Sequence, residues 1–315
     1  MIKTIYGLQQ GAKNWYNVLY KALTKLGFWR AEADHGLFYK EENGKLVILA
    51  IHIDDCLMTG GSVKLNMRVK VEINKKYKLT NLGPANWLLG IKINRNLAEH
   101  MVTLSQHAYI KSILTQYNFN DLKPSSTPMD SNMQLTISQS PTKLNDIMWM
   151  QNVPYHEAVG SLMYTTMGTQ PNITFAVLTV SQFSQNPGWA HWEAIKWIFH
   201  YLQGTKRLEL VYGGNKQELV GYVDADGASQ EHRRAILGYV FMIDGGAVSW
   251  SSKKQELITL STMEAEYVAA THTTKEVMWL RHLISEVFGP LEEPTTLFSD
   301  SQYAITLTKD GHYHA

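Results

Sequence analysis

Apolar residues recur at helical spacing near the start of the chain and at strand spacing soon after it. From Trp15 to Leu26 a large apolar residue returns every three or four positions, which predicts a helix over residues 13–28. Residues 35–55 are typical of a hairpin, because Glu42-Asn43-Gly44 forms a turn sequence and β-branched residues follow it. A second strand pair is predicted at 87–96 and 100–106, followed by a helix over 108–119.

The middle of the chain changes character twice. Residues 123–152 hold three of the nine prolines among Ser, Thr and Asn and show no sustained period, which predicts a surface connector. Residues 153–215 contain three amphipathic segments separated by Pro171 and Pro187, and we expect each segment to be a helix.

The final region alternates strands and helices. Strands are predicted over 218–226, 236–244, 247–253 and 295–300, with helices over 261–288 and 301–309. The fold class expected for the chain is therefore α+β or α/β. Its predicted parts are residues 1–122, 123–152, 153–215 and 216–315.

Composition limits the classes of function. With 44% hydrophobic and 18% charged residues, the 315-residue chain has the composition of a folded protein. Its single cysteine, Cys56, cannot form an internal disulfide, and no apolar run is long enough to span a membrane. Since the start also lacks a signal peptide, we expect a cytoplasmic or nuclear protein without a membrane partner. The net charge of +1 counts mildly against a nucleic-acid partner, because neutralising phosphates usually takes a basic surplus.

Acidic residues of the final region fall where strands and helices meet. Asp224 ends the first predicted strand, and Asp226 follows in period with it. Asp300 joins the last strand to the last helix. Each has a simple structural alternative, since Asp224 fits a turn and Asp300 fits a helix N-cap.

Glu266 has no such simple explanation. Ser261 and Glu264 match a capping box, which explains Glu264. At about 100° per residue, Glu266 instead falls within an apolar stripe of the long helix. A carboxylate there is unfavourable unless it is paired, bound to a metal, or still solvated near the helix end. The stripe consists of Met263, Ala270, Val277, Ile284 and Phe288.

A strand end, the first turn of a helix and a second strand end can converge on one face of a mixed sheet. Converging carboxylates repel one another, whereas oxygen ligands suit hard cations. Two such ions about 4 Å apart clamp an in-line phosphodiester displacement. Asp224, Glu266 and Asp300 therefore predict a two-metal site for Mg²⁺ or Mn²⁺. The negative charges of an acidic cluster also cancel the positive charges of surface Lys and Arg in the total, so the net charge is a poor guide to nucleic-acid binding here.

Several motifs resemble the Pol polyproteins of copia-type retrotransposons, in the order that this family has them. GYVDADGAS (221–229), STMEAEYVA (261–269) and SDSQYAI (299–305) are similar to motifs of its ribonuclease H domain. YGLQQGAKNWY (6–16) and IHIDDCLMTG (51–60) are similar to motifs of its reverse transcriptase. The resemblance spans essentially the whole chain. It implies a partial reverse-transcriptase palm, a helical thumb or connection, and a ribonuclease H-like mixed sheet with flanking helices.

The resemblance also implies roles for individual acids. Asp224, Glu266 and Asp300 match the first three ribonuclease H carboxylates. Asp54 and Asp55 match the paired aspartates of the polymerase palm, which bind metal ions together with a third, upstream aspartate. Because successive strand residues face opposite sides, Asp54 is expected to be the main ligand of the pair.

The partners implied are an RNA–DNA hybrid, a template–primer nucleic acid and the remaining parts of the Pol polyprotein. Gln10 lies in the motif that contacts template and incoming nucleotide. Lys253 and Lys254, beside Trp250, offer phosphate contacts, although they equally fit a solvated strand end.

Residues expected from the family but missing at the two ends of the chain limit the activity that we expect. The first palm aspartate and the fourth ribonuclease H acid are expected to be missing, so polymerisation is not expected. His312 and His314 are interpreted as remnants of a truncated motif rather than zinc ligands. Residual activity would be metal-dependent cleavage of RNA in RNA–DNA hybrids. The alternatives are a catalytically dead nucleic-acid-binding module and a decayed reading frame without a selected function.

Overall fold

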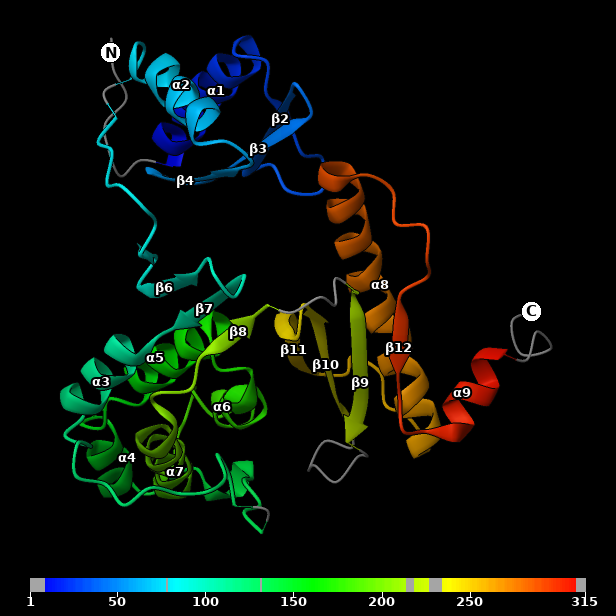
Figure 1. The fold of residues 1–315 in the computed structure, drawn as a ribbon. Coiled ribbons are helices and arrows are strands. Elements are labelled where there is room, and N and C mark those ends of the chain that lie inside the picture. The colour runs from blue at the N-terminus through cyan, green and yellow to red at the C-terminus, as the bar shows by residue number, and fades with distance from the viewer. Residues whose placement is uncertain (1–8, 78, 131, 214–217, 227–233, 310–315) are drawn as a thin grey trace. The chain divides into compact units, whose positions relative to one another are not determined.

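The computed structural model describes residues 9–77, 79–130, 132–213, 218–226 and 234–309. Contacts divide the chain into two compact units, Met1–Ala85 with Met278–Pro294, and Asn86–Val277 with Thr295–Ala315. Helix α8 (Thr262–Phe288) contributes residues to both units and is labelled in Figure 1.

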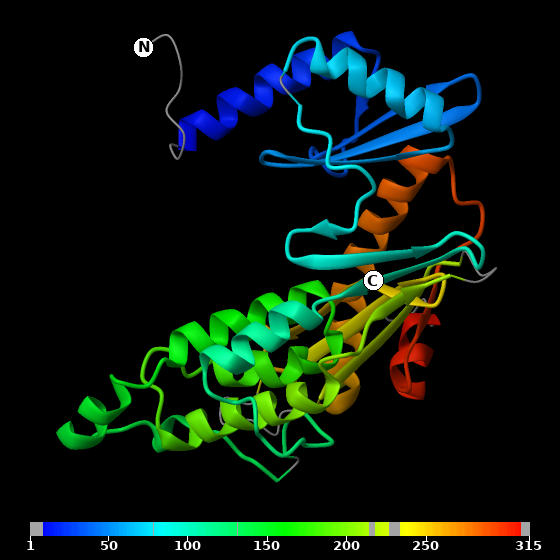
Figure 2. The same ribbon diagram turned by 60° about the vertical axis from the view of Figure 1, so that its left-hand side comes forward.

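The first unit contains an antiparallel sheet with two helices on one face. Its strand order is β1-β2-β3-β4, and Figure 2 shows α1 and α2 on the same side of it. Leu23 of α1, Phe38 of β2 and Val69 of α2 are buried together in one core. The elements are α1 (Gln9–Lys25), β1 (Trp29–Arg30), β2 (Leu37–Glu42), β3 (Lys45–His52), β4 (Asp55–Gly60) and α2 (Val63–Asn74).

The hairpin predicted in this unit is confirmed. Glu42 pairs with Lys45, and the turn residues Asn43 and Gly44 have φ angles of 53° and 68°. Positive φ at both central residues defines a type I′ turn, which the Asn-Gly sequence favours and which matches the twist of the strands. The helix predicted at 13–28 is confirmed as α1.

One sheet of the second unit is antiparallel, with strand order β5-β6-β7-β8. The predicted strand pair is confirmed as β6 and β7. Val102 of β7 also pairs with Tyr212 of β8, so the sheet is completed by a strand that follows the helical region. The strands are β5 (Trp87–Leu88), β6 (Ile91–Asn96), β7 (Met101–Ser105) and β8 (Leu210–Tyr212).

Helices between β7 and β8 share one apolar core. The helix predicted at 108–119 is confirmed as α3, and the three predicted within 153–215 are confirmed as α5, α6 and α7. Segment 123–152, predicted to be a surface connector, contains η1 and α4, and Met150 of α4 is buried in this core. The elements are α3 (His107–Gln116), η1 (Ile137–Gln139), α4 (Leu144–Met150), α5 (Tyr155–Gly168), η2 (Pro171–Ile173), α6 (Thr174–Ser181) and α7 (Trp189–Thr205).

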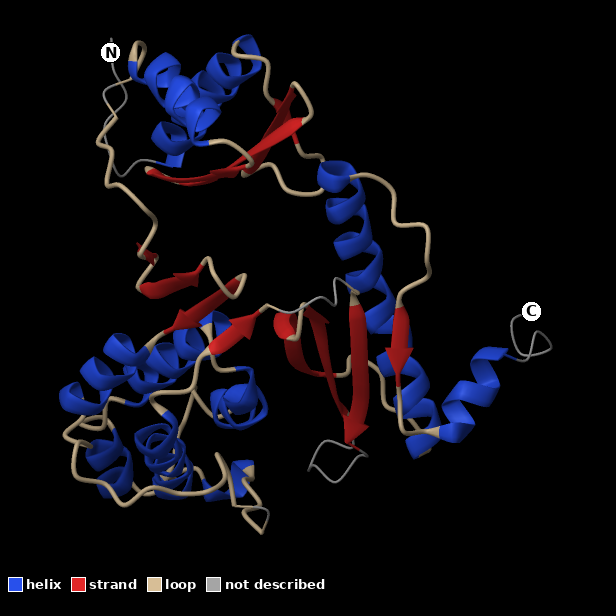
Figure 3. Ribbon diagram, viewed as in Figure 1, coloured by secondary structure: helices blue, strands red, loops and turns tan. Residues whose placement is uncertain are grey.

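The remaining sheet of the second unit is mixed. Its order is β11-β10-β9-β12, with β12 parallel to β9 and the other pairs antiparallel (Figure 3). Val223 and Leu237 are buried against Ala265 and Ala269 of α8. The elements predicted here are confirmed as β9 (Val220–Asp226), β10 (Ile236–Ile243), β11 (Gly246–Lys254), α8, β12 (Thr296–Phe298) and α9 (Gln302–Lys309).

The face that α8 buries differs from the predicted stripe. Met263 and Phe288 are 40% and 69% exposed, whereas Ala265, Ala269 and Thr273 are buried. The predicted stripe is wrong because it weighted large apolar residues, while small side chains let the helix approach the sheet closely. Glu266 is nevertheless buried, as predicted.

The described residues thus form a mixed α/β protein, as the sequence predicts. None of the helices in the described part of the chain combines the length and apolar character needed to cross a membrane.

Candidate metal centre

Parallel pairing of β9 and β12 brings two of the predicted carboxylates to the same level of the sheet. Phe298 of β12 lies opposite Tyr222 of β9. Because the two strands run in the same direction, Asp300 and Asp224 each follow two residues further on. They are therefore neighbours, with Asp224 two residues before the end of β9 and Asp300 two residues after the end of β12.

The first turn of α8 supplies the third carboxylate. The Ser261 hydroxyl accepts the N–H of Glu264 at 3.1 Å, which confirms Ser261 as the N-cap. The Glu264 carboxylate accepts the N–H of Leu260 at 2.7 Å rather than that of Ser261, so the capping box is only half formed. Gln255 Nε2 donates to the carbonyl of Ala265 at 2.8 Å. This bond ties the turn that carries Glu266 to the end of β11.

The three carboxylates meet at one point. One oxygen each from Asp224, Glu266 and Asp300 lies within 4.8 Å of the other two. Asp224 and Asp300 are exposed, whereas Glu266 is only 8% exposed. Within the described ranges no other set of three or more His, Cys, Asp or Glu side chains is placed to hold a metal ion. Because three negative charges this close repel one another, the arrangement favours a bound cation.

Burial and charge both act on Glu266. Removal from water is the main cause that raises the pKa of Glu266 from 4.5 to about 7, and the charges of Asp224 and Asp300 add to it. A hydrogen bond with the backbone of Ala225 acts in the opposite direction. Glu266 Oε2 is buried and has no hydrogen-bond partner among the described residues. A buried, unpaired carboxylate oxygen beside two further carboxylates fits a hard divalent cation.

The two predicted phosphate-contacting lysines lie on opposite faces of the mixed sheet. Lys254 and Asp226 both pair with Ile236, so Lys254 is on the face of Asp226 and Asp224. Lys253, the next residue, faces the other side. Lys254 Nζ donates to Gln182 Oε1 at 3.2 Å, and Lys253 Nζ lies 3.1 Å from a carboxylate oxygen of Glu256. Contact of either lysine with a phosphate stays a prediction.

Asp54 and Asp55 lie in the first unit and, among the described residues, belong to no group of three or more side chains spaced to hold a metal ion. His52 pairs with Asp55, so Asp54 is a turn residue and Asp55 begins β4. The alternation that favoured Asp54 assumed one strand through both residues, and it does not apply to a turn. Trp15 Nε1 of α1 donates to the carbonyl of Ile53 at 3.3 Å and thereby holds this turn. The metal-binding roles of both aspartates stay predictions.

Gln10, the predicted contact to template and nucleotide, has an exposed side chain in the first turn of α1. His312 and His314 lie outside the described residues. Gln255 was not among the predicted site residues, although its side chain is 2% exposed and positions the turn of Glu266. The sequence offers only a polar residue directly after a strand as an indication of this role. The contact with α8 depends on long-range packing, which no local sequence pattern predicts.

Known proteins share this sequence along its whole length. Residues 1–131 match a family described as reverse transcriptase (RNA-dependent DNA polymerase). The chain is 39% identical over 315 residues to the retrovirus-related Pol polyprotein from transposon TNT 1-94 of Nicotiana tabacum, covering 99% of this chain and 24% of that protein. It is 31% identical over 315 residues to the Pol polyprotein from transposon RE2 of Arabidopsis thaliana, covering 99% of this chain and 21% of the other.

A shorter relative is covered more completely. The chain is 32% identical over 276 residues to a transposon Ty5-1 protein of Saccharomyces cerevisiae, covering 87% of each chain. The chain therefore belongs to the family of copia-type retrotransposon Pol polyproteins. It spans 24% and 21% of the length of the two Pol polyproteins above. No solved structure matches it.

Proposed function

We propose that the chain carries a divalent-metal ribonuclease H centre that cleaves the RNA strand of RNA–DNA hybrids. The observation that carries this proposal is the convergence of Asp224 of β9, Glu266 in the first turn of α8 and Asp300 just after β12. Family membership supports it, because a reverse transcriptase family acts on nucleic acids within a Pol polyprotein.

The three carboxylates differ in exposure, and we assign them different roles accordingly. Asp224 and Asp300 are exposed and present oxygens toward an approaching phosphodiester, whereas Glu266 closes the ligand set from the buried side. Bound Mg²⁺ or Mn²⁺ would supply Lewis-acid activation of water and stabilisation of the leaving oxygen. Glu266 must lose its proton to act as a ligand. Gln255 and Ser261 keep Glu266 in place by fixing the first turn of α8.

For the first unit we propose a part in nucleotidyl transfer. Asp54 and Asp55 match the paired palm aspartates of the family, and Trp15 fixes the turn on which Asp54 lies. The family's palm site uses three aspartates, and these two are only part of it, so the proposed role requires a further acid from elsewhere in the polyprotein. The nuclease proposal does not depend on this part.

Cleavage of a labelled RNA–DNA hybrid tests the nuclease proposal. Purified chain should cut the RNA strand in Mg²⁺ or Mn²⁺ and leave it intact in EDTA. Asp300→Asn should abolish cutting, because it removes a charged ligand with little change of shape. Glu264→Gln, an exposed neighbour on the same helix turn, should cut like the wild type. If the wild type binds the hybrid tightly in Ca²⁺ and never cuts it, the chain is a binding module and the proposal is overturned. If it neither binds nor cuts, a decayed reading frame is the better account.

A further inference from the structure

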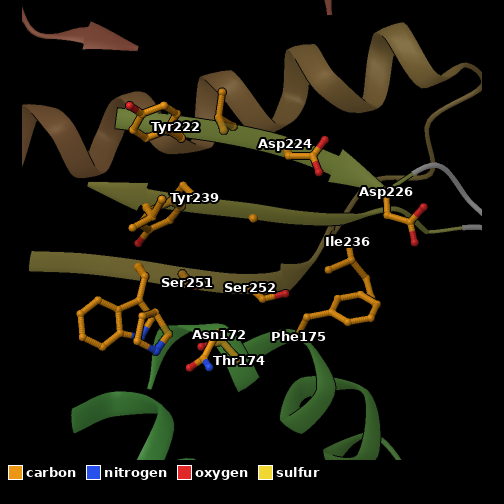
Figure 4. Close-up of a pocket in the computed structure, with 15 residues that line it drawn as sticks. Asn172, Thr174, Phe175, Tyr222, Asp224, Asp226, Ile236, Tyr239, Ser251 and Ser252 are labelled. Carbon is orange, nitrogen blue, oxygen red and sulfur yellow. The ribbon is translucent and has the colours of Figure 1, made fainter. Parts of the chain in front are cut away.

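A cavity of about 670 Å³ opens beside Asp224 in the second unit. One wall is the face of β9, β10 and β11 that points away from α8, and the other is the η2–α6 segment (Figure 4). Figure 4 shows Asn172, Thr174 and Phe175 on the helical side, with Asp224 and Asp226 at the sheet. The proposed nuclease centre therefore has a neighbouring space of defined size.

Strand alternation explains why the cavity reaches the carboxylates. Val223 and Ala225 face α8 and are buried, whereas Tyr222, Asp224 and Asp226 alternate with them on the cavity side. Gly238 is the partner of Asp224 on β10. A Cβ at Gly238 would have only the carbonyl oxygen of Ser251 within 4 Å, at 3.9 Å. The floor of the cavity is thus open in front of Asp224 because this position has no side chain.

Aromatic rings are left exposed around this space. Tyr222 is 45% exposed and stacks on Phe298, with ring centroids 5.1 Å apart and planes 23° apart. Phe175 is 42% exposed on the opposite wall. Tyr222 precedes Asp224 by two residues on the same face of β9, which is roughly 7 Å along a strand. The stacked rings of Tyr222 and Phe298 are therefore close to the proposed phosphate site at Asp224.

The cavity also offers polar groups. Thr174, Ser251 and Ser252 line it, although Thr174 Oγ1 itself is buried and has no hydrogen-bond partner within the described part of the chain. Asn172 is exposed, and its Nδ2 donates to the Tyr201 hydroxyl, so the amide is held in a fixed orientation. Apolar walls with a few fixed polar groups are typical of a small-ligand site, and the volume lies in the usual range of about 300–1,000 Å³.

We propose that this cavity binds one unpaired nucleotide of the strand whose phosphate lies at the carboxylates. The inference rests on the proposed nuclease function. A base inside a duplex is held by its pairing and stacking partners and does not enter the space beside Asp224, whereas an unpaired base can stack on aromatic side chains and bond through its free edges. The centre consequently favours sites where the hybrid meets a single-stranded segment.

Two variants change the cavity without replacing a carboxylate, although a side chain at Gly238 lies next to Asp224, its partner on β9. Phe175→Ala removes an exposed ring from the helical wall. Gly238→Leu fills the space in front of Asp224, and the backbone there tolerates a side chain, because its φ is not in the left-handed region and a Cβ meets no atom closer than 3.9 Å. Phe288→Ala is the matched control, because Phe288 is 69% exposed and does not line the cavity.

The binding test uses an RNA–DNA hybrid with 2-aminopurine in a short single-stranded overhang, titrated with protein in Ca²⁺. The wild type and Phe288→Ala should quench the fluorophore by stacking, while Phe175→Ala and Gly238→Leu should weaken the quenching interaction about tenfold. Equal quenching in all four proteins, or none in the wild type, overturns the inference.

Cleavage separates the inference from the nuclease proposal. In Mg²⁺ the wild type and Phe288→Ala should cut overhang hybrids at least tenfold more efficiently than blunt ones, and Phe175→Ala should lose that preference. Cutting without any preference for overhangs overturns the inference and leaves the nuclease proposal standing. Quenching without any cutting overturns the nuclease proposal and supports the nucleotide site.

Discussion

Replacing Glu266 with glutamine should stabilise the metal-free protein at alkaline pH. The carboxylate is 8% exposed and one of its oxygens is unpaired among the described residues, so the fold disfavours its ionised form. Its pKa is accordingly raised from 4.5 to about 7. Between these two pH values the folded state holds a proton that the unfolded state has lost. Folding stability from this group is therefore lost as the pH rises from 4.5 to about 7.

The size of the effect follows from the same shift. A pKa raised from 4.5 to about 7 corresponds to about 3 kcal/mol of unfolding free energy at pH 8. Glutamine has the shape of protonated glutamate and carries no charge. Glu266→Gln should therefore raise the unfolding free energy by about 2–3 kcal/mol at pH 8 and change it by less than about 1 kcal/mol at pH 5.

Urea unfolding in EDTA, followed by circular dichroism at both pH values, measures this difference. Glu264→Gln is the control, because Glu264 is exposed and should show no comparable pH dependence. Divalent cation should stabilise the wild type at pH 8 and leave Glu266→Gln largely unaffected. The reasoning is refuted if Glu266→Gln is no more stable, relative to the wild type, at pH 8 than at pH 5.

Three further substitutions, one of them with a matched control, probe the support of the site. Ser261→Ala should lower stability by about 1 kcal/mol through loss of the helix cap, and an unchanged urea midpoint would contradict this. Gln255→Leu should weaken Mn²⁺ binding several-fold, measured by calorimetry, because the Ala265 carbonyl loses its donor; wild-type affinity would show that the bond is dispensable. Gly221→Ala should lower the unfolding free energy by about 1–3 kcal/mol, because its Cβ would overlap the Phe241 ring and lie 2.9 Å from Leu297 Cδ1. Gly238→Ala is its control: the Cβ there has open space, so the unfolding free energy in the same urea assay should be nearly unchanged.

Features set by local chemistry could be predicted from the sequence. The Asn43-Gly44 turn follows from the backbone angles that these two residues tolerate, and the spacing of Ser261 to Glu264 predicts the helix cap. The choice of Glu266 over Glu264 as the inward-facing acid needed only the helical period. The structure confirms its burial, even though the predicted stripe around it was rotated from the true buried face.

Features set by pairing between distant segments could not. The sequence around β7 does not indicate that β8 pairs with it. The η2–α6 sequence likewise does not indicate that Phe175 lines a cavity beside Asp224. Which of Lys253 and Lys254 shares the face of Asp224 depends on the register of β10 with β11. These outcomes are decided by long-range packing, for which a single sequence gives no local signal.

Titration of Mn²⁺ into the purified protein at pH 8, followed by calorimetry, tests the central claim most directly. The claim is that Asp224, Glu266 and Asp300 together hold a divalent cation. The wild type and Glu264→Gln should bind Mn²⁺ alike, and Asp300→Asn should bind it at least tenfold more weakly, because one of three charged ligands is gone. Equal Mn²⁺ affinity in the wild type and Asp300→Asn would contradict the account.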